Sequence, residues 1–322
     1  MEIVNNPTQV GIKKAAQALM DGHLVAFPTE TVYGLGADAT NEKAVSRVYS
    51  VKARPTDHPL IVHISSINQL GKWAIDIPEY AIKLAKEFWP GPMTLILKRS
   101  EIANDFITGG QENVGVRVPS HPVALELLSE FERLGGLGVA APSANRFGKV
   151  SPTSSTDVQE DLGVYLDGND QVIDGGKSKI GIESTIISCI SEIPEILRQG
   201  AVTESLISTE LGIGINFKNE FNNVKASGLL NSHYSPQARV ILNRPAKPGE
   251  GFIAMANFET PKNVIRLASP KTSEEFAREL YSSLRLGDRY KLETIVVLIQ
   301  ETDGLLKAIY ERLIKAAGIL KS

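Results

Sequence analysis

The chain has 322 residues, and its 34 Lys and Arg against 37 Asp and Glu give a net charge of −3, so no general attraction to nucleic acid or anionic membranes is expected. This length exceeds that of a usual single domain, and a composition of 42% hydrophobic and 22% charged residues is typical of a folded protein, which predicts two domains. The single Cys189 excludes an internal disulfide, and no apolar run is long enough for a membrane span or signal peptide, so we expect a cytoplasmic protein without membrane attachment.

The first two hundred residues alternate between helical and extended patterns. Apolar residues at helical spacing predict helices over 8–21, 41–51, 78–88 and 122–131, and short apolar runs predict strands over 24–27, 60–64, 93–97, 114–118 and 138–141. Thr156 and Gln159 fit a capping box that opens one more helix. Because the spacing is irregular, a mixed sheet is favoured over a strictly parallel one.

A polar stretch over 216–232, rich in Asn, Lys and Ser, predicts a linker. After it, the patterns predict helices over 272–286 and 305–317, the first opened by a capping box of Thr272 and Glu275, and strands over 239–242, 252–256, 264–267 and 294–299. We therefore predict a larger domain over 1–214, a linker over 215–237 and a small open α/β domain over 238–322.

Two cations stand at the end of the second predicted helix, which Pro55 prevents from continuing. Lys52 and Arg54 can complement the helix dipole, or they can clamp a polyphosphate as a point charge beside a guanidinium fork. Ser143, Asn145 and Ser151 follow a buried strand, where such residues either form turns or offer hydroxyl and N–H groups to phosphate. No glycine-rich phosphate loop accompanies them, so spacing alone leaves both interpretations open.

Two predicted strands carry unusual polar residues. His63 alternates with apolar neighbours and shares a face with Ile61, which favours a half-buried structural histidine. Arg117 lies in a valine-rich strand, where it needs a counter-ion and could receive a carboxylate with both arms of its guanidinium.

Four further residues carry polar groups whose role the local sequence leaves open. Glu183 and Ser184 open a predicted strand, and Arg198 follows the next one, where it could be a surface cation. Tyr234 ends the polar linker, and an aromatic side chain there needs a surface to pack on, which a linker folded over the site would supply.

An ordered set of motifs carries a resemblance to a known family. The set comprises Pro28-Thr29-Glu30-Thr31-Val32-Tyr33-Gly34-Leu35, Lys52-Ala53-Arg54-Pro55, His58-Pro59-Leu60-Ile61-Val62-His63, Pro90-Gly91-Pro92-Met93-Thr94, Val116-Arg117-Val118-Pro119, Pro142-Ser143-Ala144-Asn145, Ser151-Pro152-Thr153 and Glu183-Ser184-Thr185. Together these segments resemble the YrdC-like L-threonylcarbamoyladenylate synthases, and the linker ending in His233-Tyr234-Ser235-Pro236 resembles their long, two-domain form. The resemblance implies a YrdC-like twisted mixed sheet with flanking helices, followed by a smaller Rossmann-like open α/β domain.

The resemblance also implies an activity. L-threonine, bicarbonate and ATP would become L-threonylcarbamoyl-AMP, pyrophosphate and water, a nucleotidyl transfer assisted by Mg²⁺, with no metal ligand assigned to a protein side chain. The product would serve the tRNA threonylcarbamoyl transferase machinery that forms N6-threonylcarbamoyladenosine in tRNAs reading codons that begin with A. Direct contact with tRNA or double-stranded RNA is left open.

Residue by residue, the resemblance implies two groups. The expected ATP group is Lys52, Arg54, His58, Asn113, Ser143, Asn145, Ser151, Arg198 and Tyr234, of which Lys52, Arg54, Ser143 and Asn145 would be catalytic. The expected threonine group is Thr31, His63, Arg117, Ala141 and Ser184, with Arg117 holding the substrate carboxylate.

Two alternatives compete with this hypothesis. Hydrogenase maturation proteins perform related carbamoyl-adenylate chemistry, but they are longer and carry cysteine-based zinc motifs, which one cysteine cannot form. The second alternative is a module that binds tRNA or double-stranded RNA without turnover, and the net charge of −3 argues against it.

Overall fold

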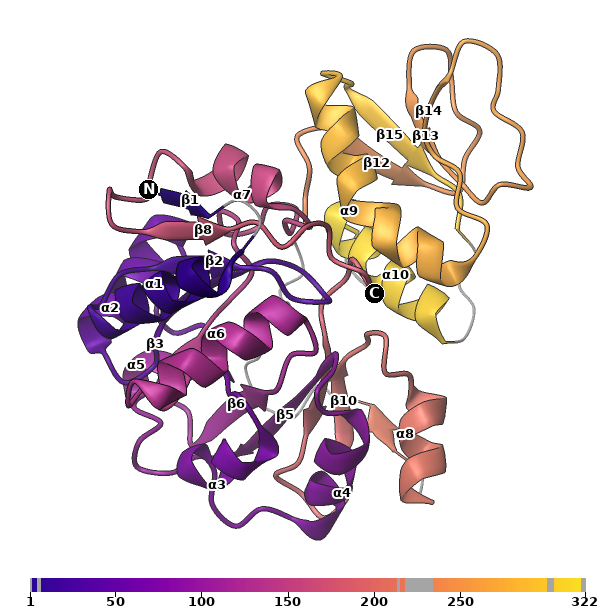
Figure 1. Ribbon diagram of the computed structural model, residues 1–322. Coiled ribbons are helices and arrows are strands. Elements are labelled where there is room, and N and C mark those ends of the chain that lie inside the picture. Colours follow the sequence, from indigo (N-terminus) through magenta and orange to yellow (C-terminus); the bar gives the residue numbers. More distant parts are fainter. Residues whose placement is uncertain (1, 5–6, 213–214, 218–233, 300–303, 320–322) are drawn as a thin grey trace.

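The computed structural model describes residues 2–4, 7–212, 215–217, 234–299 and 304–319. They form two α/β bodies, one built on an eleven-stranded mixed sheet and the other on a four-stranded sheet (Figure 1). The predicted α/β class with a large mixed sheet and a smaller second domain is confirmed.

The large sheet places its strands out of chain order. Across the sheet they run β1 (Glu2–Val4), β8 (Gln171–Ile173), β2 (Val25–Phe27), β3 (Gly34–Asp38), β7 (Val139–Ala140), β4 (Ile61–His63), β6 (Asn113–Arg117), β5 (Met93–Lys98), β9 (Thr185–Ser188), β10 (Glu195–Arg198) and β11 (Asn216–Phe217). The central pair β4 and β6 is parallel, and antiparallel β7 and β5 flank it. β11 begins within the segment predicted as a linker, of which 218–233 lie outside the described residues.

Strand β3 was not among the predicted strands, because its glycines resemble a turn. The structure shows why one of them is required. A Cβ atom on Gly36 would lie 2.7 Å from Val139 Cγ1 and 2.8 Å from Phe27 Cε1, so only glycine permits this packing without a shift.

Helices cover both faces of the large sheet. They are α1 (Gln9–Met20), α2 (Glu42–Lys52), α3 (Leu70–Trp73), α4 (Glu79–Phe88), α5 (Asp105–Thr108), α6 (Pro122–Arg133), α7 (Ser155–Leu162) and α8 (Glu204–Leu211), with a 3-10 turn, η1, at Ile67–Gln69. Val25, Phe27 and Val139 pack with α1 and α6, whereas the alternating Ala26 and Val62 join the larger core cluster. This alternation buries both faces of the sheet.

Side-chain caps explain where most of the helices begin, and one of the predicted caps is wrong. Thr8 and Asn41 cap α1 and α2 through their side-chain oxygens. The predicted capping box of Thr156 and Gln159 is wrong, because Ser154 caps α7 by accepting from the amide of Asp157 and Thr156 already lies inside the helix.

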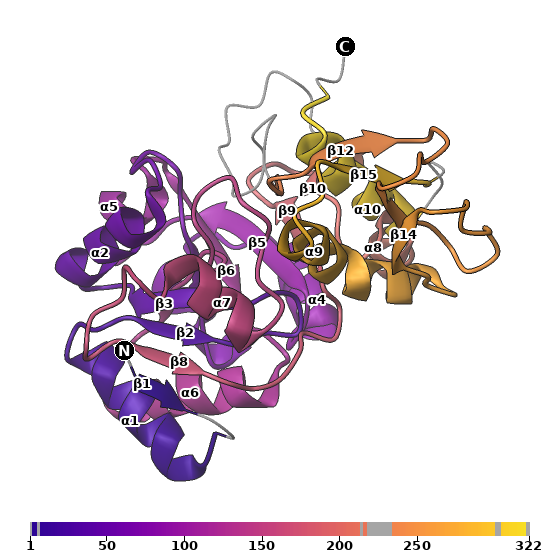
Figure 2. The same cartoon turned by 90° about the horizontal axis from the view of Figure 1, so that it is seen from above.

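The second body is a parallel sheet in the order β12 (Arg239–Leu242), β15 (Thr294–Val297), β13 (Gly251–Ile253) and β14 (Ile265–Ala268). Helix α9 (Ser273–Arg289) is capped by Thr272, which accepts from the amide of Glu275 as predicted, and α10 (Leu305–Ala316) follows. In Figure 2, α9 lies between α7 of the first body and the rest of the second. Within the described residues, no helix is long and apolar enough to cross a membrane.

Candidate functional site

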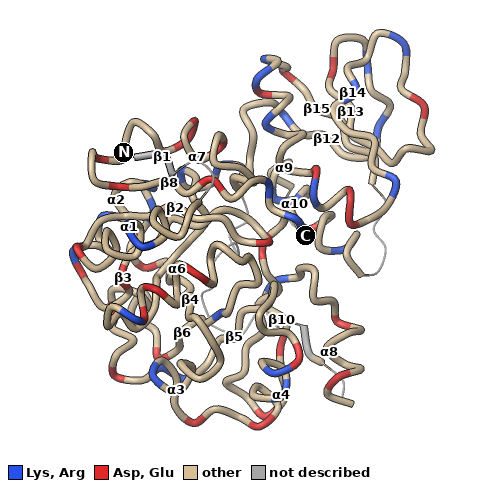
Figure 3. The backbone as a smooth tube through the Cα atoms, viewed as in Figure 1, with Lys and Arg blue, Asp and Glu red and all other residues tan. Residues whose placement is uncertain are grey.

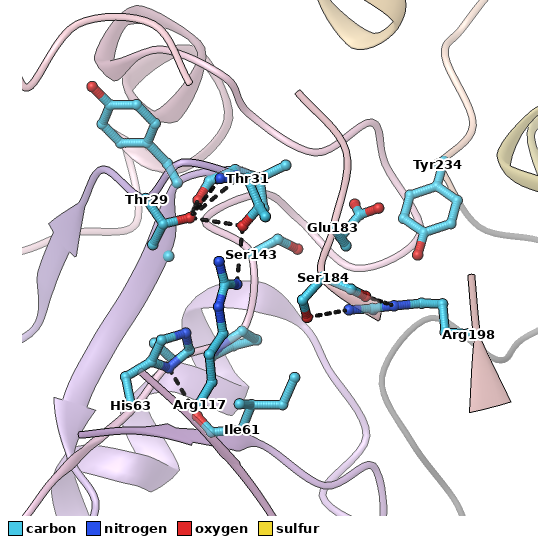
Figure 4. Close-up of a pocket in the computed structure, with 15 residues that line it drawn as sticks. Thr29, Thr31, Ile61, His63, Arg117, Ser143, Glu183, Ser184, Arg198 and Tyr234 are labelled. Carbon is cyan, nitrogen blue, oxygen red and sulfur yellow. Dashed lines mark hydrogen bonds between the residues drawn. The ribbon is translucent and has the colours of Figure 1, made fainter. Parts of the chain in front are cut away.

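A pocket lies over one face of the central strands of the large sheet, and segments far apart in sequence line it (Figure 4). Its lining residues are Thr29, Thr31, Val32, Tyr33, Gly34, Ile61, His63, Arg117, Ala141, Pro142, Ser143, Glu183, Ser184, Arg198 and Tyr234. All five residues of the expected threonine group line it, and of the expected ATP group Ser143, Arg198 and Tyr234 do.

Strand register explains how two of these side chains meet. β4 and β6 are parallel, and His63 pairs with Arg117 across them, so both side chains point to the same face. Ile61 lies two residues before His63 and lines the pocket as well, as the alternation in the sequence predicted.

Arg117 is held rigidly by three groups. Its Nη2 lies 2.5 Å from Glu30 Oε1, its Nη1 donates to Thr31 Oγ1 at 3.0 Å, and its Nε donates to the carbonyl of Gly91 at 3.2 Å. The second oxygen of Glu30 accepts from the amide of Ser120 at 3.0 Å. The counter-ion that the sequence required is therefore Glu30, which sequence reasoning did not identify because it lies 87 positions away in a turn-like motif.

His63 is held in its neutral form. Its ring meets Phe27 edge to face at 5.9 Å, and its Nδ1 lies 3.2 Å from the carbonyl of Ile61. Burial, with the charge of Arg117 as a second cause, lowers its pKa from 6.5 to about 3. A neutral imidazole beside Arg117 adds no second positive charge to the pocket.

Lys52 and Arg54 lie outside the pocket lining, but Lys52 contacts the loop that carries Ser143, which lines the pocket. Lys52 ends α2, and Ala53 then takes a left-handed conformation with φ 49°, which turns the chain before Arg54. The Nζ of Lys52 lies 2.5 Å from the carbonyl oxygens of both Ser143 and Asn145. Lys52 is thus fastened to the loop whose side chains were expected to bind ATP.

Both cations are buried, with only 1% of Lys52 and 6% of Arg54 exposed. Arg54 donates to the carbonyls of His58 and Pro59, and within the described part of the chain neither cation forms an ion pair with a carboxylate. Burial, with the neighbouring Arg54 as a lesser cause, lowers the pKa of Lys52 well below its usual value, and burial lowers that of Arg54 to about 10. This pair is a local excess of buried positive charge.

The remaining residues of the expected ATP group occupy varied positions. His58 meets Phe147 edge to face at 5.3 Å, Asn113 lies at the opposite end of β6 from Arg117, and Ser151 donates to Glu183 at 2.6 Å. Arg198 is 6% exposed, so the surface-cation interpretation is wrong. Its guanidinium donates to the carbonyl and hydroxyl oxygens of Ser184, 3.0 and 3.1 Å away (Figure 4).

Tyr234 packs against another aromatic ring, as the sequence analysis required, and this ring belongs to the second body. It is 2% exposed, and its ring stacks on that of Tyr281 in α9 with centroids 5.6 Å apart. The next amide, that of Ser235, donates to the carbonyl of Gly148, which fixes this end of the linker beside the pocket.

One acidic cluster lies apart from these residues. His23, Asp167 and Asp170 offer ligand atoms within 4.8 Å of one another, but Arg47 lies 2.7 Å from a carboxylate oxygen of each aspartate. These contacts make the cluster an ion-pair network.

Comparisons with known proteins agree with this geometry. The family model Sua5_yciO_yrdC, described as "Telomere recombination", matches residues 17–200, and the model described as "Threonylcarbamoyl-AMP synthase, C-terminal domain" matches residues 190–318. The threonylcarbamoyl-AMP synthase of Pyrococcus abyssi is 42% identical over 95% of this chain and 94% of its own length, and that of Bacillus subtilis is 38% identical over 98% and 95%. A crystal structure of P. abyssi Sua5 complexed with L-threonine superimposes with a TM-score of 0.89 at 39% identity, covering 99% of this chain and 98% of that one.

The fold and the pocket define a YrdC-like catalytic domain joined to a second α/β domain. The chain belongs to the Sua5/YciO/YrdC family, in its two-domain form with the threonylcarbamoyl-AMP synthase C-terminal domain.

Proposed function

We propose that the pocket binds L-threonine and that ATP lies beside it, against the loop fastened by Lys52. The chain is a threonylcarbamoyl-AMP synthase, a nucleotidyl-transfer enzyme with L-threonine and ATP as substrates. The residue roles, the co-substrate bicarbonate and Mg²⁺ are parts of the proposal. The domain limits 1–214, 215–237 and 238–322 and a cytoplasmic location likewise stay predictions.

Threonine fits the pocket through its charged and polar groups. Arg117, oriented by Glu30, has a planar fork suited to the substrate carboxylate, and the hydroxyls of Thr31 and Ser184 can bond its polar groups. Neutral His63 and small Ala141 complete the wall without adding charge near the substrate amine. The amine must be uncharged to take up CO₂ or bicarbonate. Among the described residues, the carboxylate that lines the pocket is that of Glu183, and its partners Ser151, Tyr281 and Arg312 leave it little capacity to stabilise the ammonium form.

The observation that carries the ATP assignment is the pair of buried cations, Lys52 and Arg54. Their described hydrogen-bond partners are carbonyl oxygens, so a polyphosphate would supply the missing negative charge. We assign Ser143 and Asn145 to the same contact, because their loop is anchored by Lys52. The remaining members of the ATP group are His58, Asn113, Ser151, Arg198 and Tyr234.

The residues act by positioning and electrostatic stabilisation. A carbamate oxygen formed on threonine attacks the α-phosphate of ATP, and pyrophosphate leaves as the bond to the β-phosphate oxygen breaks. Lys52 and Arg54 would stabilise charge on the departing phosphates, while Arg117 holds threonine for attack.

A Mg²⁺ ion would neutralise part of the phosphate charge. Within the described residues, Glu183 is the carboxylate that lines the pocket, and Arg312 and Tyr281 already bind it. This fits an ion held by the phosphates of ATP rather than by protein side chains.

The product would pass to the tRNA threonylcarbamoyl transferase machinery. Along the described backbone, Lys and Arg are interspersed with Asp and Glu (Figure 3), and this distribution offers no support for the RNA-binding alternative.

The test is pyrophosphate release from ATP by the purified full chain, with L-threonine and bicarbonate present together and then omitted singly. Release should require both. Arg117→Gln should raise the KM for L-threonine, whereas Glu112→Gln, which changes an exposed partner of Arg99, should behave as the wild type. Release indifferent to L-threonine would contradict the proposed substrate site.

A further inference from the structure

A buried carboxylate in the pocket wall joins the two domains. Glu183 comes from the first domain, just before β9, and is 7% exposed. One of its oxygens accepts from Ser151 at 2.6 Å, and the other accepts from Tyr281 of α9 at 2.8 Å and from Arg312 of α10 at 3.2 Å. A residue of the pocket wall therefore depends on the second domain for its partners.

The side chain of Arg312 is buried at this contact between the domains. It is 2% exposed, and it also donates to the carbonyls of Gln199, at 2.5 Å, and of Glu183 itself, at 3.3 Å. Burial alone would raise the pKa of Glu183, but the charges of Arg312 and Arg198, together with the hydrogen bonds from Ser151 and Tyr281, lower it, so Glu183 stays ionised. Without Arg312, a carboxylate would be buried with much less compensating charge.

The backbone around Glu183 is fitted closely to the second domain. Gly181 has φ 84°, and a Cβ atom there would lie 2.5 Å from the Cα of Arg278 in α9. Only a glycine allows this approach, which places the following Ile182 in the core cluster of the second domain.

We propose that the C-terminal domain positions the ATP side of the active site through Tyr281 and Arg312. These two residues hold the Glu183 carboxylate, which holds the hydroxyl of Ser151, and the ring of Tyr281 supports the ring of Tyr234. Tyr281 and Arg312 act through other residues and are positioning residues. The inference rests on the proposed placement of ATP at Ser151 and Tyr234.

The same domain interface contains a contact that serves as a control. Arg289 of α9 pairs with Asp157 and Glu160 of α7 at 2.8 and 2.9 Å, and none of these three residues lines the pocket. Loss of this contact should weaken docking of the two domains without removing a partner of Glu183. A variant of Arg289 therefore distinguishes weaker docking of the domains from a loss of the partners that position Glu183.

The experiment measures the KM for ATP, the KM for L-threonine and kcat in the full chain. Tyr281→Phe keeps the ring under Tyr234 and removes one bond to Glu183, Arg312→Gln removes the charge, and Arg312→Lys restores it. Arg289→Gln is the matched control, and thermal unfolding checks that every variant is folded.

Tyr281→Phe should raise the KM for ATP about tenfold, as expected for the loss of one hydrogen bond to a charged group, with a smaller change in the KM for L-threonine. Arg312→Gln should raise it further, and Arg312→Lys should recover part of the loss. Arg289→Gln should keep the wild-type KM for ATP even where it lowers the unfolding temperature. An unchanged KM for ATP in both Tyr281→Phe and Arg312→Gln, or an equal rise in Arg289→Gln, would overturn the inference.

Ser151→Ala separates this inference from the proposed function. If Ser151→Ala raises the KM for ATP and neither Tyr281→Phe nor Arg312→Gln does, ATP lies where proposed and the positioning role is wrong. If Ser151→Ala has no effect on the KM for ATP, the proposed ATP placement fails, and the positioning route through Ser151 fails with it.

Discussion

Replacing Glu30 by Gln tests the buried pair that orients Arg117. The side chains of Arg117 and Glu30 are only 5% and 6% exposed, and the two oxygens of Glu30 accept from Arg117 Nη2 and from the amide of Ser120. A Gln side chain offers one acceptor in place of two. Its NH₂ group would therefore face one of these donors, and the positive charge of Arg117 would lose its buried counter-charge.

The expected cost is large, because removing one partner of a buried ion pair typically destabilises a protein by about 3–5 kcal/mol. For a domain of about two hundred residues, each kcal/mol lowers the unfolding temperature by roughly 2–4 °C, so a fall on the order of 10 °C is expected. The matched control is Glu112→Gln, because Glu112 is 84% exposed and its pair with Arg99 should contribute little.

The assay is thermal unfolding with and without saturating L-threonine. If Arg117 receives the substrate carboxylate, L-threonine replaces the missing counter-charge, so it should raise the unfolding temperature of Glu30→Gln more than that of the wild type. Wild-type stability in Glu30→Gln would refute the energetic reasoning. A destabilised Glu30→Gln with no larger response to L-threonine would refute the assignment of Arg117.

Three further predictions concern Lys52, His63 and Tyr234. Because burial lowers the pKa of Lys52 and bound phosphate would favour its charged form, the ATP affinity measured by calorimetry should fall as the pH rises through that lowered pKa, and Lys52→Met should bind ATP more weakly and without this pH dependence. Burial and Arg117 lower the pKa of His63 from 6.5 to about 3. As the pH falls, His63 therefore takes up its proton in the unfolded state first, and the folded state loses stability between these two pKa values. In thermal unfolding from pH 7 to pH 4, His63→Gln should lose less stability than the wild type. Tyr234→Ala removes the stack on Tyr281 and should raise the KM for ATP more than that for L-threonine in steady-state assays, and an equal rise in both would contradict the placement of ATP.

Features encoded by near neighbours were predictable from the sequence. The alternation around His63 predicted that Ile61 shares its face, and both residues line the pocket. The cap of α9 by Thr272 was predicted from a spacing of three residues. Such patterns depend only on strand or helix geometry, so one sequence contains the information that they need.

Features that depend on distant partners were not predictable in the same way. The valine-rich strand showed that Arg117 needs a counter-ion, but nothing local identified Glu30, which lies 87 positions earlier. Glu183 and Arg312 are 129 positions apart and come from different domains, so their pairing depends on how the domains pack. The burial of Arg198 was not predictable for the same reason, because it depends on strands that the fold brings together.

The site contains two kinds of buried charge, and the difference between them is informative. Arg117 and Glu183 have permanent partners of opposite charge, which fixes their geometry before any substrate arrives. Lys52 and Arg54 are bound to carbonyl groups that orient them without neutralising them, and burial lowers their pKa values. A polyanion binds most favourably to charges of the second kind, because it neutralises buried positive charge that the folded protein already holds at a cost in free energy. In a chain whose net charge is −3, this local excess of positive charge supports the proposal that Lys52 and Arg54 bind the phosphates of ATP.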